Sequence, residues 1–222
     1  MSPEISLVRY DQEQDAALLK VLEKRRSVRA FSPVAVSKDD VEKIVYAGLL
    51  APYAAAAVEG VKDFRRFVVI AGNSPKLGLI SELFKKRAGQ SLAELKSRFA
   101  GQALPAFASR LERAQQSGLP GLGRVPWYII ACEQRGIPPS ERQSLAHVLQ
   151  NMWLRAASLG LGFQLISMFD QLADEKEFTN AIGISHGRYA VAGCAIGVPE
   201  NPPGSNPFSQ KLDLAAFLSW VD

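Results

Sequence analysis

The sequence predicts an α+β sandwich in which several helices surround a mostly antiparallel sheet. Short runs of β-branched and aromatic residues alternate with longer runs whose apolar residues recur at helical spacing. Only three or four of these runs are strand-like, and no repeat or linker divides the chain, so we expect one domain over residues 1–222. Hydrophobic residues make up 47% of the chain and charged residues 22%, which is enough apolar material for a core.

The N-terminal half is expected to contain three helices and one strand. Residues 12–26 have apolar positions at helical spacing and end in arginines. Ser37 precedes a second amphipathic run and has Asp40 three residues on, which is the pattern of a helix N-cap. Residues 64–72 are β-branched and aromatic and end in glycine, so we expect a strand there. A third helix should follow over about 76–86.

The C-terminal half contains the clearest helix and the most central strand. Residues 88–124 combine helix-like pieces with a loop rich in glycine and proline. The clearest helix should start after Ser140, with Gln143 at the capping-box position, and should end at Gly160. The other expected elements are a strand at 125–133, a short extended piece at 163–169, a short helix at 174–184, a central strand at 188–199 and a terminal helix at 213–220.

Composition excludes several classes of function. The net charge of +4 is too small to indicate nucleic-acid binding without a basic stripe. No run approaches the roughly 20 apolar residues of a membrane span, and the first residues lack the apolar core of a signal peptide. Cys132 and Cys194 lie in apolar runs and are interpreted as buried free thiols. With only His147 and His186 besides, no metal-site spacing occurs. We expect a cytoplasmic protein without nucleic-acid, membrane or metal partners.

One short stretch, "EKRRSVRAF", concentrates positive charge around a hydroxyl. It has three interpretations: a nucleic-acid patch, a solvated helix end, or a binding site for one anion. A favourable interaction with the helix dipole explains Lys24 and Arg25 at a helix C-terminus. It does not explain Ser27 and Arg29 in the non-helical exit. Arginine forks suit phosphate, and a serine hydroxyl adds a donor, so phosphate is the anion that this pattern favours.

A resemblance to a known family strengthens the phosphate interpretation. "KRRSVRAF" followed by "VSKDDVEKIVYAGLLAP" resembles the opening of the nitroreductase family of FMN-dependent oxidoreductases. "RRFVVIAG", "RVPWYIIAC", "LAHVLQNMWLRAASLGLG" and "AVAGCAIGVPENPP" resemble later segments of that family, in the same order. The resemblance covers about two thirds of the chain. It implies a helix-rich, three-layer nitroreductase-like sandwich, with a helical excursion at about 88–124 that covers the pocket.

The resemblance also implies an activity. The chain would pass hydride from NADH or NADPH through N5 of a bound FMN to a small acceptor such as a nitroaromatic, a quinone or an enone. The FMN would lie at the interface of a homodimer. No side chain is assigned as a catalytic acid or base, because the flavin carries the chemistry.

The cofactor-binding residues that the resemblance implies fall into four groups. In chain order these are Arg25, Arg26, Ser27 and Arg29; Pro52, Tyr53 and Ala54; Leu165, Ile166, Ser167 and Met168; and Lys211. The first group would bind the phosphate and ribityl chain and reach the edge of the ring. The second would reach the FMN of the other subunit, and the third would run past the ring with a backbone N–H facing N5. The last would approach the phosphate as a point charge, because lysine replaces the commoner arginine.

One region departs from the family. The family commonly continues with Ser-x-Asn-x-Gln-Pro-Trp after the second helix, whereas this chain reads "APYAAAAVEGVKDFRRF". Loss of the two amides implies a more apolar flavin pocket, a different substrate or weaker FMN binding, and Tyr53 either contacts the ring or only packs. Three rival functions stay open: a flavin-binding protein without turnover, for storage or sensing; a flavin enzyme of unusual outcome; and an interaction module with a basic face.

Overall fold

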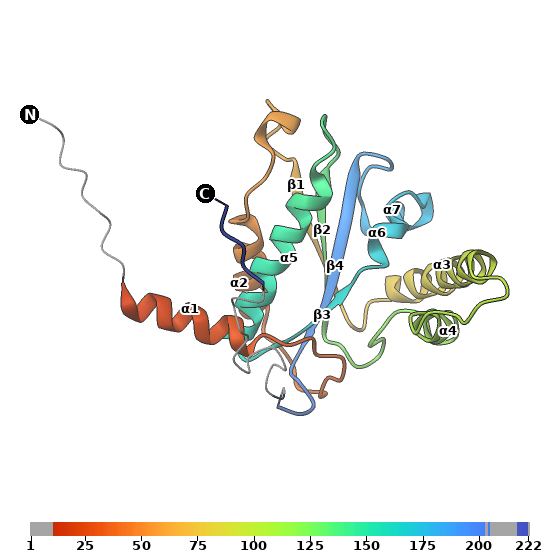
Figure 1. Cartoon of the computed structure of the whole chain (residues 1–222), viewed down its shortest axis with the longest axis horizontal. Coiled ribbons are helices and arrows are strands. Elements are labelled where there is room, and N and C mark those ends of the chain that lie inside the picture. The colour runs from red at the N-terminus through yellow and green to blue at the C-terminus, as the bar shows by residue number, and fades with distance from the viewer. Residues whose placement is uncertain (1–10, 203, 205–216, 222) are drawn as a thin grey trace, which may run out of the picture.

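A four-stranded sheet lies between two layers of helices (Figure 1). The computed structural model describes residues 11–202, 204 and 217–221. The strands are β1 (Arg65–Ala71), β2 (Trp127–Gln134), β3 (Gly162–Ile166) and β4 (Tyr189–Gly197). Their order is β1-β2-β4-β3, and every neighbouring pair is antiparallel. The expected α+β sandwich with an antiparallel sheet is therefore confirmed.

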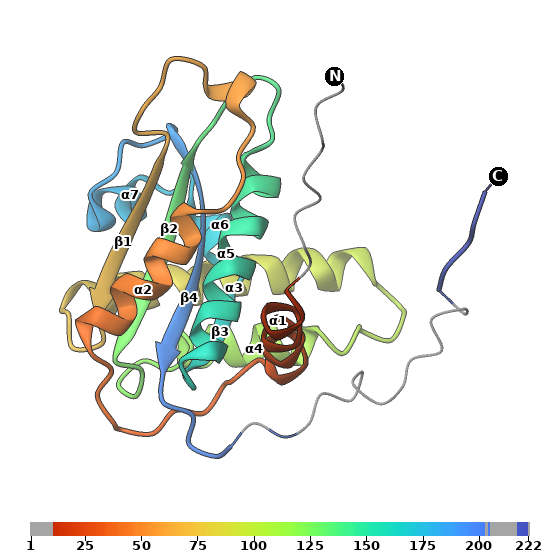
Figure 2. The same cartoon turned by 90° about the vertical axis from the view of Figure 1, so that its left-hand side faces the viewer.

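The helices divide between the two faces of the sheet. They are α1 (Gln12–Lys24), α2 (Lys38–Leu49), α3 (Lys76–Arg98), α4 (Ala108–Ser117), α5 (Glu141–Ser158), α6 (Phe169–Leu172) and α7 (Lys176–Ile182), with a 3-10 turn at Ala55–Val58. Helices α2 and α5 cover one face, and α3, α6 and α7 lie on the other (Figures 1 and 2). Helix α1 projects away from the body and meets α5 only near its own C-terminal end (Figure 1).

Alternation along the strands produces one core on each face. Ile129 and Ala131 of β2 face α2 and α5, whereas Tyr128, Ile130 and Cys132 face the other layer. Strand β4 pairs on both sides and is buried along nearly its whole length, as expected for the central strand. Both free cysteines, Cys132 and Cys194, are buried as predicted. No helix in the described part of the chain is long and apolar enough to cross a membrane.

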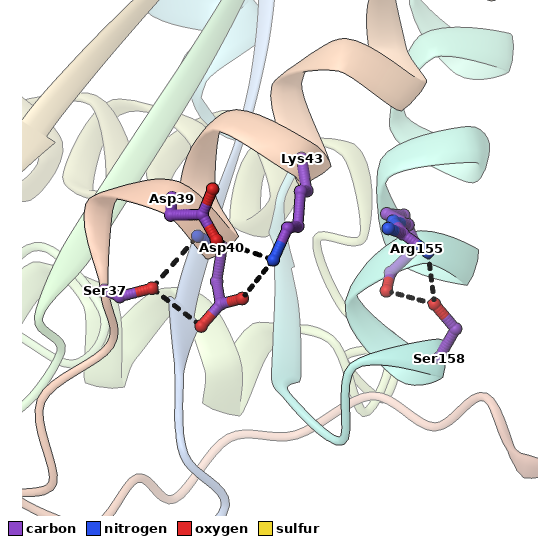
Figure 3. Close-up of polar contacts among 6 residues, drawn as sticks. All are labelled: Ser37, Asp39, Asp40, Lys43, Arg155 and Ser158. Atoms are coloured by element: carbon purple, nitrogen blue, oxygen red, sulfur yellow. Dashed lines mark hydrogen bonds and ion pairs between the residues drawn. The ribbon is translucent and has the colours of Figure 1, made fainter.

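The start of α2 confirms the predicted cap (Figure 3). The Ser37 hydroxyl accepts a hydrogen bond from the backbone N–H of Asp40 at 3.0 Å and donates one to its carboxylate at 2.8 Å. The Lys43 ammonium lies 2.6 Å from a carboxylate oxygen of Asp39 and 3.4 Å from one of Asp40. These contacts, the bond from Ser37 first, hold the pKa of Asp40 below its ordinary value.

Ser140 stands at the N-cap position of α5 as predicted, but its side chain does not cap the helix. The ψ of Ser140 is 2° rather than extended, so its hydroxyl makes no bond to a helix N–H and lies 3.5 Å from the carbonyl oxygen of Pro138. The helix still ends as expected, because Gly160 adopts the left-handed φ of 73° that stops it. The expected terminal helix is absent from residues 217–221, and the rest of that segment lies outside the described residues.

Residues 88–124 are largely helical, as expected. Helix α3 does not end near residue 86 but continues to Arg98, because Leu92 packs with Ala108 and Leu111 of α4 in a small core of their own. The two helices form a hairpin that stands out from the body on the side opposite α5 (Figure 1). Its role as a cover for a pocket stays a prediction.

Candidate functional site

The segment from Arg25 to Arg29, called the basic segment below, runs beside the edge strand β3. The backbone N–H of Val28 donates to the carbonyl oxygen of Phe163 at 3.1 Å, and Ser27 forms a parallel bridge with the same residue. Close approach is possible because Gly162 has no side chain: a Cβ there would lie 2.8 Å from a methyl of Val28. The exit from α1 is therefore fixed to the sheet rather than free in solvent.

Trp153 of α5 holds the basic segment from the other side. Its indole N–H donates to the carbonyl oxygen of Arg26 at 3.1 Å, and the guanidinium of Arg25 lies 4.2 Å from its ring centroid. The indole also stacks on Phe163, with ring centroids 5.0 Å apart. The first predicted group of residues is thus anchored by Trp153, which lies outside the four predicted groups.

The basic segment has positive charge available for an anion. Arg25 and Arg26 are half-buried, and Ser27 and Arg29 are exposed. Neither Arg25 nor Arg29 forms an ion pair with an acidic side chain of the described residues. Two guanidinium groups without an acidic partner among these residues, together with a hydroxyl in the same segment, suit an anion with several acceptor oxygens, such as a phosphate.

Beside the basic segment, a cavity of about 330 Å³, called the edge cavity below, opens between α5 and β3. Its lining residues are Arg142, Leu145, Ala146, Leu149, Gln150, Trp153, Leu165, Ser167, Asp170, Val191 and Ala192. It runs from Trp153 to Arg142, which is roughly 17 Å along the helix axis. At the far end the guanidinium of Arg142 lies 3.4 Å from the carboxylate of Asp170. The edge cavity is mostly apolar and lies next to the arginines of the basic segment. This combination suits a flat ligand that carries a phosphate group.

The third predicted group contributes to this cavity unequally. Leu165 and Ser167 are exposed and line the cavity. Ile166 points to the opposite face and is buried in the core there, because neighbouring strand residues alternate. Met168 packs partly buried against the same core and the α3–α4 hairpin. Only the backbone of these two residues is therefore a candidate for contact with a ligand in the edge cavity.

The second predicted group lies elsewhere in the chain. Pro52, Tyr53 and Ala54 line a separate cavity of about 230 Å³. It is also lined by Ser140, which precedes α5, and by Gln143, Ser144 and His147 of α5, which lie on average roughly 130° around the helix axis from the residues of the edge cavity. None of the pockets described for the placed residues is lined both by the loop after α2 and by the edge of β3. The fourth predicted group, Lys211, lies outside the described residues.

A larger groove of about 840 Å³ lies at the other end of the strands from the loop after α2. It is lined by residues 31, 33–36, 71–73, 123–127 and 200, and by none of the predicted site residues. Its only charged lining residues are Arg124 and Glu200. We place the candidate site at the edge cavity, because that cavity combines an apolar slot with the arginines of the basic segment.

Comparison with known proteins gives a family and a fold. A model of the nitroreductase family matches residues 22–198. A nitroreductase with bound FMN from Bacteroides fragilis NCTC 9343 has a TM-score of 0.67 at 20% identity, covering 92% of this chain and 98% of that one. A BluB-like flavoprotein from Clostridium difficile 630 has a TM-score of 0.67 at 21% identity, covering 96% and 100%. A nitroreductase with bound FMN from Desulfitobacterium hafniense DCB-2 has a TM-score of 0.61 at 20% identity, covering 93% and 98%. No curated protein gives a match.

Proposed function

The chain belongs to the nitroreductase family, whose model spans residues 22–198, and we propose that it is an FMN-dependent oxidoreductase. The observation that carries the proposal is the position of the basic segment, fixed by Trp153 and β3 at the end of an apolar cavity. This geometry supports FMN as the cofactor, because a cluster of arginines would bind its phosphate and the apolar cavity would take its flat ring. When bound, FMN supplies the transfer of electrons from NADH or NADPH to the acceptor.

The residues of the chain would bind and orient the cofactor. Arg25, Arg26 and Ser27 would hold the phosphate, and Arg29 would reach the ring edge and stabilise the negative charge that reduction adds. Leu165 and Ser167 would form one wall of the ring site. No described strand lies beyond β3, and an edge strand presents backbone N–H groups that no neighbouring strand uses.

A homodimer would complete each site. The loop after α2 and the edge cavity lie roughly 130° apart around α5, so a second copy packed along α5 would bring the loop of one copy to the cavity of the other. Large apolar side chains lie exposed near this side of the molecule: Leu18, Leu19 and Leu22 of α1, and Tyr46 and Leu49 of α2. Burial in a dimer would explain their exposure. Sedimentation equilibrium is expected to give twice the mass of the chain.

The acceptor would be a small, flat compound, such as a nitroaromatic, a quinone or an enone. The walls of the edge cavity are mostly apolar, which favours such compounds over strongly charged ones. None of the residues that line the cavity comes from the α3–α4 hairpin. The hairpin would therefore cover the pocket of the partner subunit rather than its own.

A second function is favoured by the alanine-rich loop. The hydroxyl of Tyr53 makes no hydrogen bond to the described residues, and the alanines that follow offer no polar side chain to a ring. A site with fewer polar contacts would suit a flavin-binding protein without turnover. FMN that stays bound while NADH and NADPH remain unoxidised with every acceptor would favour this function over the enzyme.

The test is an absorbance spectrum recorded after FMN is added and the excess is removed by gel filtration. Wild-type protein is expected to retain bands near about 370 and 450 nm, and Arg25→Ala is expected to lose most of them. Arg66→Ala is the matched control, because Arg66 is half-exposed on β1, the opposite edge of the sheet. Wild-type protein without retained flavin would overturn the proposed function.

A further inference from the structure

The loop after α2 is held by one buried arginine. The Nε of Arg65 donates to the carboxylate of Glu133 at 2.9 Å, and only 3% and 4% of the two side chains are exposed. Nη1 donates to three backbone carbonyl oxygens, those of Ala51 at 2.7 Å, Gly48 at 3.2 Å and Leu49 at 3.4 Å. Nη2 donates to the carbonyl oxygen of Pro52 at 3.2 Å. A single guanidinium thus satisfies the last carbonyls of α2 and the first of the loop.

The loop has two further anchors. The ring of Tyr53 lies against Phe64, with centroids 4.1 Å apart. A Cβ added to Gly136 would lie 2.4 Å from the carbonyl oxygen of Ala57, so the turn after the loop packs directly on the backbone that leads into α5. This contact explains why a glycine stands at position 136. The alanine-rich loop is therefore held in place by these contacts, although it lacks the polar residues that the family commonly has there.

The buried pair of Arg65 and Glu133 is weak evidence for a role in stability alone. A buried ion pair costs desolvation energy, and apolar residues of similar size often serve as well. Here four of the five hydrogen bonds of Arg65 go to backbone carbonyls between Gly48 and Pro52, so the side chain sets the path of the backbone. Glu133 lies opposite Arg65 in the β1–β2 register and orients the guanidinium toward those carbonyls.

We infer that Arg65, oriented by Glu133, is a positioning residue for the cofactor site of the partner subunit. It holds Pro52, Tyr53 and Ala54 beside α5, where the proposed dimer brings them to the flavin ring in the edge cavity of the other copy. Arg65 itself does not touch the cofactor. This inference rests on the proposed function, and its failure is distinguishable from the failure of that function.

The first experiment measures FMN affinity by quenching of flavin fluorescence. Arg65→Lys keeps the positive charge but loses the branched guanidinium that bonds several carbonyl oxygens at once. The loop would then be held less firmly, so FMN is expected to bind about tenfold more weakly. Arg66→Lys is the matched control, because Arg66 is the next residue on β1 and pairs with Asp63 at the surface. Equal affinity in wild type and Arg65→Lys would overturn the inference while leaving the proposed function intact. Should Arg65→Lys fail to fold, Phe64→Leu takes its place in both experiments, because it removes the ring on which both Tyr53 and the Arg65 guanidinium pack.

The second experiment separates positioning from general destabilisation. Arg25→Ala and Arg65→Lys are co-expressed with different tags, and the mixed dimer is purified. Each site takes its basic segment from one subunit and its loop after α2 from the other. One site of the mixed dimer therefore has both substitutions, whereas the other has an unaltered basic segment and an unaltered loop. The mixed dimer is expected to bind about one FMN at wild-type affinity, although neither parent does. A mixed dimer that binds no better than its parents would overturn the inference, because a purely structural defect is not relieved by the partner.

Discussion

The guanidinium of Arg25 lies 4.2 Å from the ring centroid of Trp153, an aromatic residue in the second turn from the C-terminus of α5. The same indole donates to the carbonyl oxygen of Arg26 at 3.1 Å. The charge of one residue and the backbone of the next are thus fixed by a single side chain. Trp153 also lines the edge cavity, so the proposed phosphate site and the proposed ring site share one wall.

Trp153→Phe tests this coupling. Phenylalanine keeps a ring over Phe163 but loses the N–H that binds Arg26, so FMN is expected to bind about three- to tenfold more weakly. Trp127→Phe is the matched control, because the Trp127 indole donates in the same way to the carbonyl oxygen of Val36 at 2.9 Å, away from the edge cavity. Both variants are expected to lose similar stability in urea. Equal FMN affinity in the two variants would contradict the coupling.

The elements of the fold were largely predictable, because their signals are local. Ser37 caps α2 as expected, and Gly160 and Gly183 stop their helices with φ of 73° and 74°. Helix α6 was missed, because its four residues are too few to show periodicity. The extension of α3 was missed as well, since it depends on packing against α4, which no local pattern reveals.

The candidate site was only half predictable, because its parts meet through tertiary contacts. The basic segment carries a local motif, and its residues do lie together. Its tie to Trp153 joins segments far apart in the chain. Arg65 and Glu133 look like ordinary members of two strands until the β1–β2 register sets them opposite each other. Sequence reasoning identified the residues proposed to touch the cofactor but not those that hold them.

Gly136→Ala is expected to displace the loop after α2, because the added methyl group would collide with the backbone of Ala57. A Cβ would lie 2.4 Å from the Ala57 carbonyl oxygen, which is backbone and has no rotamer to change. We expect a loss of about 1–3 kcal/mol in the free energy of unfolding and weaker FMN binding. Gly78→Ala is the control with the opposite sign: it lies in α3 with no atom near the added methyl, and a gain of about 0.5–1 kcal/mol is expected. Urea unfolding measures both, and equal midpoints would contradict the close contact.

Ser37→Ala is expected to cost about 1 kcal/mol of stability at pH 7, because it removes the cap of α2. Part of this cost depends on pH. The hydroxyl also donates to the Asp40 carboxylate and lowers its pKa, so that contribution is present above the ordinary value of 3.8 and is lost as the pH falls through the folded-state pKa. The gap between wild type and Ser37→Ala in urea unfolding should therefore be smaller at pH 3 than at pH 7. Ser32→Ala is the control, because the buried Ser32 hydroxyl has no hydrogen-bond partner among the described residues.

The two cysteines are expected to be inert in the folded protein. Burial raises the pKa of the Cys132 thiol to about 12 and raises that of Cys194 as well. At pH 8 the thiolate fraction of Cys132 is then on the order of 10⁻⁴, and neither sulfur is accessible. Ellman's reagent should label neither thiol in native protein at pH 8 and both in urea. Rapid labelling of native protein would show that β2 or β4 opens readily, contrary to their place at the centre of the sheet.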